Sequence, residues 1–132
     1  WDEVMNILNV TLIQNENHRS YENFGFMIMH GERIKIVDEI AKDIEKKYTN
    51  KKWLDTDIYI SLMSNSGSSG RHSDIVDVYY VQSLGKAKWI IEENEKSYEY
   101  ILEVGDMIYC PNNMIHTVTF DEPRVGLSIG YK

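Results

Sequence analysis

The segment GDMIYCPNNMIH, residues 105–116, alternates turn-forming residues with short apolar runs. Its glycine is typical of a turn. The apolar residues that follow, up to Cys110, are typical of a short strand, and Pro111–Asn113 are typical of a second turn. His116 then opens another apolar run. Because a β-barrel can bring the starts of distant strands side by side, His116 is a candidate for a site shared with residues far away in the sequence.

A second segment, GRHSDIVDVYYVQSLGKAKW at residues 70–89, places His72 and Asp74 two residues apart ahead of an apolar run. Side chains i and i+2 share one face of a strand, so we expect these two to point the same way. Such a pair can bind a metal ion, form an internal hydrogen bond or face water. With His116 it makes two histidines and one carboxylate, which is the ligand set of non-haem Fe(II) oxygenases.

Short runs rich in Ile, Val and Tyr fill the chain from Trp53 onward, with turns between them. Seven such strands at regular spacing predict an antiparallel sandwich or barrel. The runs are residues 57–63, 74–82, 87–93, 97–104, 106–110, 116–120 and 124–131.

The first part of the chain has a different pattern. Residues 4–13 suit either a helix or a strand, and Phe24–Gly31 reads as a short strand that a glycine turn ends. Over residues 32–48 apolar side chains recur at helical spacing, which predicts an amphipathic helix. We therefore expect one domain over residues 1–132, with an α-containing segment at 1–52 and a β-barrel core at 53–132.

The composition is ordinary for a globular protein of 132 residues, with 42% hydrophobic and 27% charged residues. The net charge of −7 argues against nucleic acid or an anionic membrane as a partner. A lysine cluster at residues 46–52 fits a helix end better than a polyanion site. Cys110 is the single cysteine, which excludes an intrachain disulfide and suits a cytoplasmic location. No run approaches the ~18 apolar residues of a membrane span.

The two quoted segments resemble the motifs of the cupin superfamily, and in particular of the JmjC-type, cupin-like Fe(II) and 2-oxoglutarate-dependent oxygenases. The downstream segment has the spacing of the second cupin motif, with Asn113 at the usual glycine; Asn also tolerates the left-handed conformation. The resemblance covers about residues 58–132. The upstream segment matches the family pattern at His72, Asp74, Asp77, Tyr79, Gln82, Gly85 and Trp89.

This resemblance implies a double-stranded β-helix, which is the jelly-roll barrel of the cupins, and iron held by His72, Asp74 and His116. It also implies a dioxygenase with 2-oxoglutarate as cosubstrate. One departure stands out, because the family often has a lysine where this chain has Ala87. Arg124 and Ser128 on the last strand can replace it by gripping a carboxylate. Arg124 can equally occupy a surface ion pair with Asp121 or Glu122.

Several residues have two interpretations. Tyr59, Ser61 and Tyr80 can line the pocket, with hydroxyls toward the cosubstrate, and the two tyrosines can equally be core or rim residues. Asp77 is out of phase with the ligand face, which argues against a fourth ligand. Cys110 fits a small buried residue better than a nucleophile. The small-residue tract 64–70 is either a flexible connection or a lip beside the site.

Two other functions stay open at this level. Ala87 favours a metal-dependent cupin that does not use 2-oxoglutarate, and the short length favours a non-catalytic binding module. For an enzyme, the substrate is either a small molecule or a protein side chain. The strand at Phe24–His30 can support a homodimer.

Overall fold

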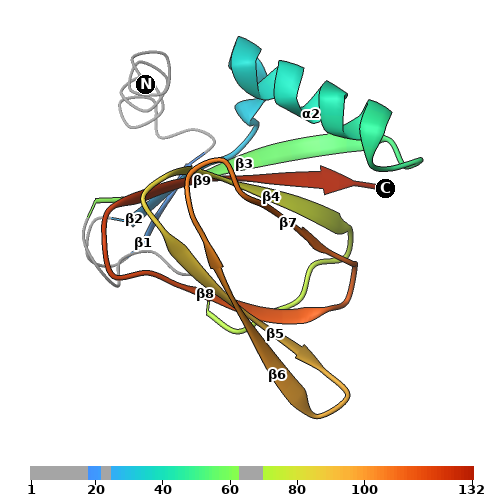
Figure 1. Ribbon diagram of the computed structural model, residues 1–132. Coiled ribbons are helices and arrows are strands. Elements are labelled where there is room, and N and C mark those ends of the chain that lie inside the picture. Colours follow the sequence, from blue (N-terminus) through green and yellow to red (C-terminus); the bar gives the residue numbers. More distant parts are fainter. Residues whose placement is uncertain (1–17, 22–24, 63–69) are drawn as a thin grey trace.

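Two antiparallel sheets face each other in the computed structural model, which describes residues 18–21, 25–62 and 70–132 (Figure 1). The larger sheet has six strands in the order β1 (His18–Tyr21), β2 (Gly25–Ile28), β3 (Trp53–Ser61), β9 (Arg124–Tyr131), β4 (Asp77–Leu84) and β7 (Met107–Cys110). The smaller sheet has three, in the order β6 (Lys96–Leu102), β5 (Ala87–Glu93) and β8 (Ile115–Thr119).

The segment that contains His72 completes the smaller sheet. His72 forms an isolated antiparallel bridge with His116 of β8, so it stands where a fourth strand would run. Each sheet then contributes four positions to a barrel: β3, β9, β4 and β7 on one side, and β6, β5, β8 and the His72 bridge on the other. This is a double-stranded β-helix, and the expectation of a mainly β barrel is confirmed.

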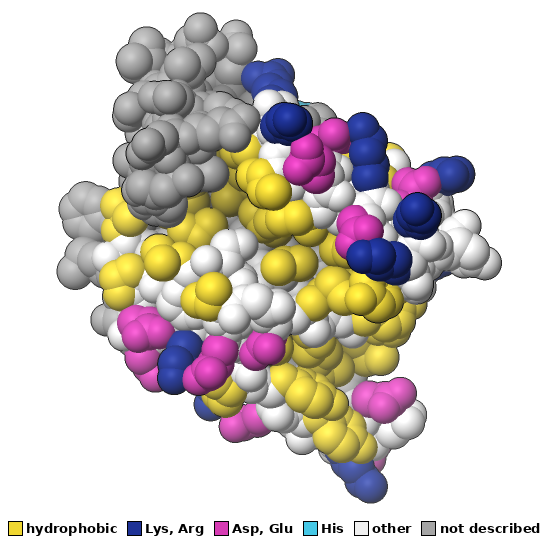
Figure 2. Space-filling view, turned by 45° about the horizontal axis from the view of Figure 1, so that its top comes forward, with side chains coloured by type: hydrophobic (Ala, Val, Ile, Leu, Met, Phe, Trp, Pro, Cys, Tyr) yellow, Lys and Arg dark blue, Asp and Glu magenta, His cyan; other side chains and the backbone are white. Residues whose placement is uncertain are grey.

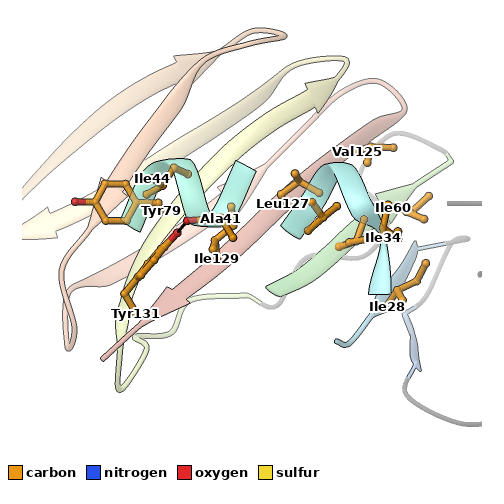
Figure 3. Close-up of a cluster of buried hydrophobic side chains, with 12 residues drawn as sticks. Ile28, Ile34, Ala41, Ile44, Ile60, Tyr79, Val125, Leu127, Ile129 and Tyr131 are labelled. Atoms are coloured by element: carbon orange, nitrogen blue, oxygen red, sulfur yellow. Dashed lines mark hydrogen bonds between the residues drawn. The ribbon is translucent and has the colours of Figure 1, made fainter. Parts of the chain in front are cut away.

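One helix covers the outer face of the larger sheet (Figure 1). After a short 3₁₀ turn, η1 (Gly31–Arg33), α2 runs over Lys35–Lys47, within the predicted 32–48. Its apolar stripe buries Val37, Ala41 and Ile44. Figure 3 shows Ala41 and Ile44 facing side chains of β9, where the Tyr131 hydroxyl donates a 2.6 Å hydrogen bond to the Ala41 carbonyl.

Charged side chains occupy the solvent face of α2, as Figure 2 shows. Several form ion pairs one helical turn apart, such as Lys42 with Asp38 at 2.9 Å and Lys47 with Asp43 at 2.6 Å. Lys46 and Lys47 lie in the last turn of the helix, as the sequence indicated. No helix in the described ranges is long and apolar enough to cross a membrane.

Strand β9 separates two cores by simple alternation. Val125, Leu127, Ile129 and Tyr131 are buried in the cluster under α2. Arg124 and Ser128 have the opposite parity and line a pocket inside the barrel. That interior also holds Val78 and Tyr80 of β4 and Ala87, Trp89 and Ile91 of β5. The larger sheet therefore lies between two cores, one under the helix and one inside the barrel.

The structure corrects one expected strand boundary. The run predicted over residues 74–82 becomes a strand only at Asp77. His72 takes part in a single bridge, Asp74 lies in neither strand nor helix, and the next residue, Ile75, is 85% exposed. The shared direction of His72 and Asp74 therefore has another cause than strand alternation.

Strand β2 confirms the short strand expected near Phe24–Gly31. It pairs with β1 on one side and β3 on the other, so both of its edges are already hydrogen-bonded within the chain. A homodimer through this segment stays a prediction. The ambiguous run 4–13 and most of the tract 64–70 lie outside the described residues.

Candidate metal centre

His72, Asp74 and His116 converge at one point inside the mouth of the barrel. Each offers one ligand atom, and these atoms all lie within 4.8 Å of one another. Nε2 of His72 is 3.8 Å from Asp74 Oδ1, and Nε2 of His116 is 3.6 Å from Asp74 Oδ2. Small side-chain rotations suffice for one cation to bond to all three, because such bonds are about 2.1 Å long.

A backbone bridge brings the two imidazoles together. The His72 N–H donates to the His116 carbonyl at 3.0 Å, and the His116 N–H donates back to the His72 carbonyl at 2.8 Å. Residues directly opposite in an antiparallel pair place their side chains on the same face. The ring centroids consequently lie 4.4 Å apart.

The turn between β7 and β8 fixes the third ligand. The Asn113 N–H donates a 2.7 Å hydrogen bond to the Asp74 carbonyl, and the Met114 N–H closes the turn on the Pro111 carbonyl at 3.1 Å. Asn113 has a φ of 62°, the left-handed conformation that the sequence suggested. The turn thus replaces strand alternation as the reason why Asp74 faces the histidines.

Both imidazoles are oriented for metal binding through Nε2. Nδ1 of His72 lies 3.0 Å from the Gly70 carbonyl, and Nδ1 of His116 lies 3.1 Å from the Met114 carbonyl. A carbonyl can only accept, so each Nδ1 donates a hydrogen bond, and each Nε2 faces the Asp74 carboxylate. Histidine ligands of metals are usually held in this way.

Burial lowers the pKa of His116, and the nearby His72 lowers it further, although the bond to the Met114 carbonyl acts in the opposite direction. His116 is therefore neutral at physiological pH, which is the form that binds a cation. The donor set of two imidazoles and one carboxylate fits a divalent transition metal.

The four residues expected to bind the cosubstrate line the same pocket as the three candidate ligands. These are Tyr59, Tyr80, Arg124 and Ser128. Arg124 is only 2% exposed, so its alternative place in a surface ion pair with Asp121 or Glu122 is wrong. Its Nη1 donates to the Tyr80 hydroxyl at 2.6 Å, and its guanidinium lies 4.1 Å from the centre of the Phe120 ring.

Tyr80 belongs to a buried chain of hydrogen bonds. Its hydroxyl donates to Gln82 Oε1 at 3.0 Å, and Gln82 Nε2 donates to the Leu84 carbonyl at 2.7 Å. Burial raises the pKa of Tyr80, so the phenol stays protonated. Its ring lies against Gly126, where an added Cβ would come within 1.8 Å of the hydroxyl oxygen. Glycine at this position is what allows Tyr80 to reach Arg124.

Ala87 is buried on the barrel face of β5 and provides no charge. Its neighbours Lys86 and Lys88 form ion pairs with Glu103 at 2.7 Å and Glu99 at 3.4 Å. Neither lysine lines the pocket, in agreement with their strand parity. Among the described residues, Arg124 is the only arginine or lysine that lines it.

The sequence did not reveal two neighbours of His116. Trp89 stacks on its imidazole, with centroids 4.9 Å apart and planes 18° from parallel. Cys110 Sγ lies 3.4 Å from its Nδ1. The sequence could have indicated the stacking contact, because Trp89 is two residues after Ala87 and so points to the same face of the strand. Burial raises the pKa of Cys110 to about 11, so the thiol is protonated and suits a small packing residue.

Asp77 lies outside the ligand cluster. Its Oδ2 accepts hydrogen bonds from Lys51 Nζ at 2.8 Å and from the Tyr109 hydroxyl at 2.8 Å, and its Oδ1 accepts the Asn112 N–H at 3.1 Å. Although burial raises the pKa of Asp77, the hydrogen bonds from Lys51, Asn112 and Tyr109 together hold it below the ordinary value. The carboxylate is therefore ionised.

Comparison with known families gives one match. The JmjC domain model matches residues 90–132, which contain His116 and Arg124 but neither His72 nor Asp74. None of the curated proteins compared with the chain matches it.

Solved structures share the fold at low sequence identity. YcfD, a ribosomal oxygenase from Escherichia coli, superposes with a TM-score of 0.71 at 20% identity, over 82% of this chain and 31% of YcfD. Its complex with cobalt and 2-oxoglutarate gives 0.70 at 19% identity, with the same coverage. A cupin superfamily protein from Desulfitobacterium hafniense gives 0.51 at 16% identity, over 58% of this chain and 65% of that protein.

The chain spans about a third of the length of YcfD. These matches confirm the resemblance that the motifs suggested. The chain has the double-stranded β-helix fold of the cupin superfamily, and its C-terminal third matches the JmjC domain.

Proposed function

We propose that this chain forms the metal- and cosubstrate-binding barrel of an Fe(II)- and 2-oxoglutarate-dependent oxygenase, a hydroxylase of the cupin-like class. One observation carries the proposal: two imidazoles and a carboxylate converge in a pocket that also contains a buried arginine. A similar barrel, that of YcfD, has been solved with cobalt and 2-oxoglutarate. The proposal includes a cytoplasmic location and a substrate that is a small molecule or a protein side chain.

His72, Asp74 and His116 would hold the iron from one side. Iron(II) held by these residues would supply the redox chemistry by which a 2-oxo acid and O₂ oxidise a substrate. The protein pre-orients both imidazoles through the carbonyls of Gly70 and Met114. Pre-orientation favours binding because fewer side-chain rotations are lost when the metal arrives.

Arg124 would bind the carboxylate of the cosubstrate that lies farther from the metal. The Tyr80 hydroxyl and the Phe120 ring fix its guanidinium, and Ser128 lies two residues beyond Gly126 on the same face of β9. A fixed guanidinium binds a carboxylate through two parallel hydrogen bonds. Tyr59 and Tyr80 add hydroxyl groups to the same wall.

The cavity between these side chains is narrow, at about 30 Å³. A cavity of that size holds about two water molecules, since one needs about 10–15 Å³. Trp89 and Val118 form the apolar part of the lining, which favours the exclusion of water once a ligand is in place.

The test is calorimetric titration of the full chain under anaerobic conditions. Protein loaded with Mn(II), as a redox-inert substitute for Fe(II), should bind 2-oxoglutarate, and metal-free protein should not. Arg124→Met keeps the apolar volume and removes the charge, so it should weaken 2-oxoglutarate binding by about 10- to 100-fold and leave Mn(II) affinity unchanged. Tight diacid binding by Arg124→Met would contradict the assigned role.

A second candidate is a metal-dependent cupin that does not use 2-oxoglutarate. The buried Ala87, which stands where the family often has a lysine, favours it. In that case the wild-type chain binds Mn(II), and 2-oxoglutarate does not bind in the presence of the metal. Absence of metal binding would instead favour a binding module without catalysis.

A further inference from the structure

The carboxylate of Asp77 lies outside the barrel interior, yet its contacts lead to the metal centre. Asp77 is 4% exposed and starts β4, three residues after Asp74. Its parity directs it away from the pocket. A buried, ionised side chain at such a place needs several partners, since an unpaired buried charge is strongly destabilising.

The link begins at the turn Pro111–Met114. This turn supports two of the three candidate ligands at once, because the Asn113 N–H donates to the Asp74 carbonyl at 2.7 Å and the Met114 carbonyl lies 3.1 Å from His116 Nδ1. A displacement of the turn would therefore move Asp74 and rotate the His116 imidazole together.

Asp77 holds this turn from the other side. Its Oδ1 accepts the Asn112 N–H at 3.1 Å, and its Oδ2 accepts the Tyr109 hydroxyl at 2.8 Å, on the strand that leads into the turn. Lys51, from the loop after α2, contributes an ion pair at 2.8 Å. Three residues from two other parts of the chain thus meet at the Asp77 carboxylate.

We propose that Asp77 is a positioning residue, which fixes the geometry of the metal centre through the Pro111–Met114 turn. This inference rests on the proposed function. Without the carboxylate, the Asn112 N–H and the Tyr109 hydroxyl lose their acceptor, and the turn loses the bonds that hold it on the side away from the ligands.

The test is Mn(II) binding by the full chain, followed through the electron paramagnetic resonance signal of the free ion. Asp77→Ala should raise the Kd for Mn(II) by about tenfold, the lower end for partners that orient metal ligands. Asp77→Asn should raise it less, because its amide oxygen can still accept the Asn112 N–H.

Tyr131→Phe is the matched control. Tyr131 lies opposite Asp77 on β9, is fully buried, and donates one hydrogen bond on the helix side, to the Ala41 carbonyl. It should destabilise the fold without changing Mn(II) affinity. The visible absorption bands of bound Co(II) provide a second readout, and they should shift in Asp77→Ala but not in Tyr131→Phe.

The outcomes separate this inference from the proposed function. A wild-type chain that binds neither Mn(II) nor Co(II) would overturn both. Metal binding by the wild type with an unchanged Kd in Asp77→Asn and in folded Asp77→Ala would overturn only the role of Asp77. Equal weakening in Tyr131→Phe would also overturn it, because the effect would then be one of general stability.

Discussion

His72 and His116 are joined by two backbone hydrogen bonds of 3.0 and 2.8 Å, and their imidazoles share one face as a result. The pairing of the chain in this region does not depend on either side chain. The site geometry and the fold can therefore be tested separately.

We predict that His72→Ala abolishes metal binding and leaves the fold intact. The backbone bridge survives the substitution, and the imidazole is partly exposed, so little buried surface is lost. Metal content should fall from about one ion per chain to near zero, with an unchanged circular dichroism spectrum. The control is His30→Asn, outside the site, where Asn tolerates the observed φ of 62°. Retention of metal by His72→Ala would show that the site is drawn incorrectly.

Tyr80→Phe should weaken both stability and cosubstrate binding. The substitution removes the acceptor for Arg124 and the donor to Gln82 Oε1, so we expect a loss of about 1–2 kcal/mol in the free energy of unfolding. Binding of 2-oxoglutarate should weaken severalfold as Arg124 loses its orientation, with Mn(II) affinity unchanged. Urea denaturation and calorimetry measure the two effects. Tyr98→Phe on the exposed strand β6 is the control, and equal losses there would contradict the prediction.

Gly126→Ala should destabilise the fold by about 1–3 kcal/mol or more, because its Cβ would overlap the Tyr80 ring. In a Tyr80→Ala background the same substitution should cost much less. A double-mutant cycle in urea therefore gives a large coupling energy between the two positions. Equal costs in the two backgrounds would mean that the contact is not what excludes a side chain from position 126.

The stability of the metal-free chain should fall as the pH drops below about 6.5. The folded-state pKa of His116 is lowered by burial from its ordinary value of 6.5, so the unfolded chain binds a proton that the folded chain does not. Stability then decreases by up to about 1.4 kcal/mol per pH unit for this one group. Urea midpoints between pH 7.5 and 5.5 measure the slope. His116→Gln should flatten it, and an unchanged slope in that variant would assign the effect to other groups.

Cys110 should resist alkylation in the folded chain. The thiol is 2% exposed and its pKa is raised to about 11. At pH 8 the reagent therefore has little access to the sulfur, and little of the thiol is in the reactive thiolate form. Iodoacetamide should modify it roughly 100-fold more slowly than in urea, as followed by mass spectrometry. Because the chain has one cysteine, the product is unambiguous. Rapid labelling in native buffer would show that the β7–β8 region opens readily.

The sequence predicted much of the fold because the signals were local. Helical spacing located α2, and alternation with turn residues located the barrel strands to within a few residues. The parity of Arg124 and Ser128 correctly indicated a common face, whereas the burial of Arg124 depends on Phe120 and Tyr80, and no local pattern reports it.

The convergence of the three ligands required information that the sequence does not carry locally. Strand alternation suggested that His72 and Asp74 share a direction, but the actual causes are the His72–His116 bridge and the bond from Asn113 to Asp74. Both join residues about 40 positions apart in the sequence. The stacking of Trp89 on His116 was missed for the same reason, since it depends on the register between β5 and β8.

The alternation along β9 has a genetic consequence. Its odd-numbered residues pack in the hydrophobic core beneath α2, and Arg124 and Ser128 face the ligand pocket. Deletion of one codon within this strand would move every residue beyond the deletion to the opposite face. Isoleucine and leucine would then face the pocket, and polar side chains would face the hydrophobic core. Substitutions on one face can accumulate without disturbing the other, but length changes here would damage both folding and binding in a single step.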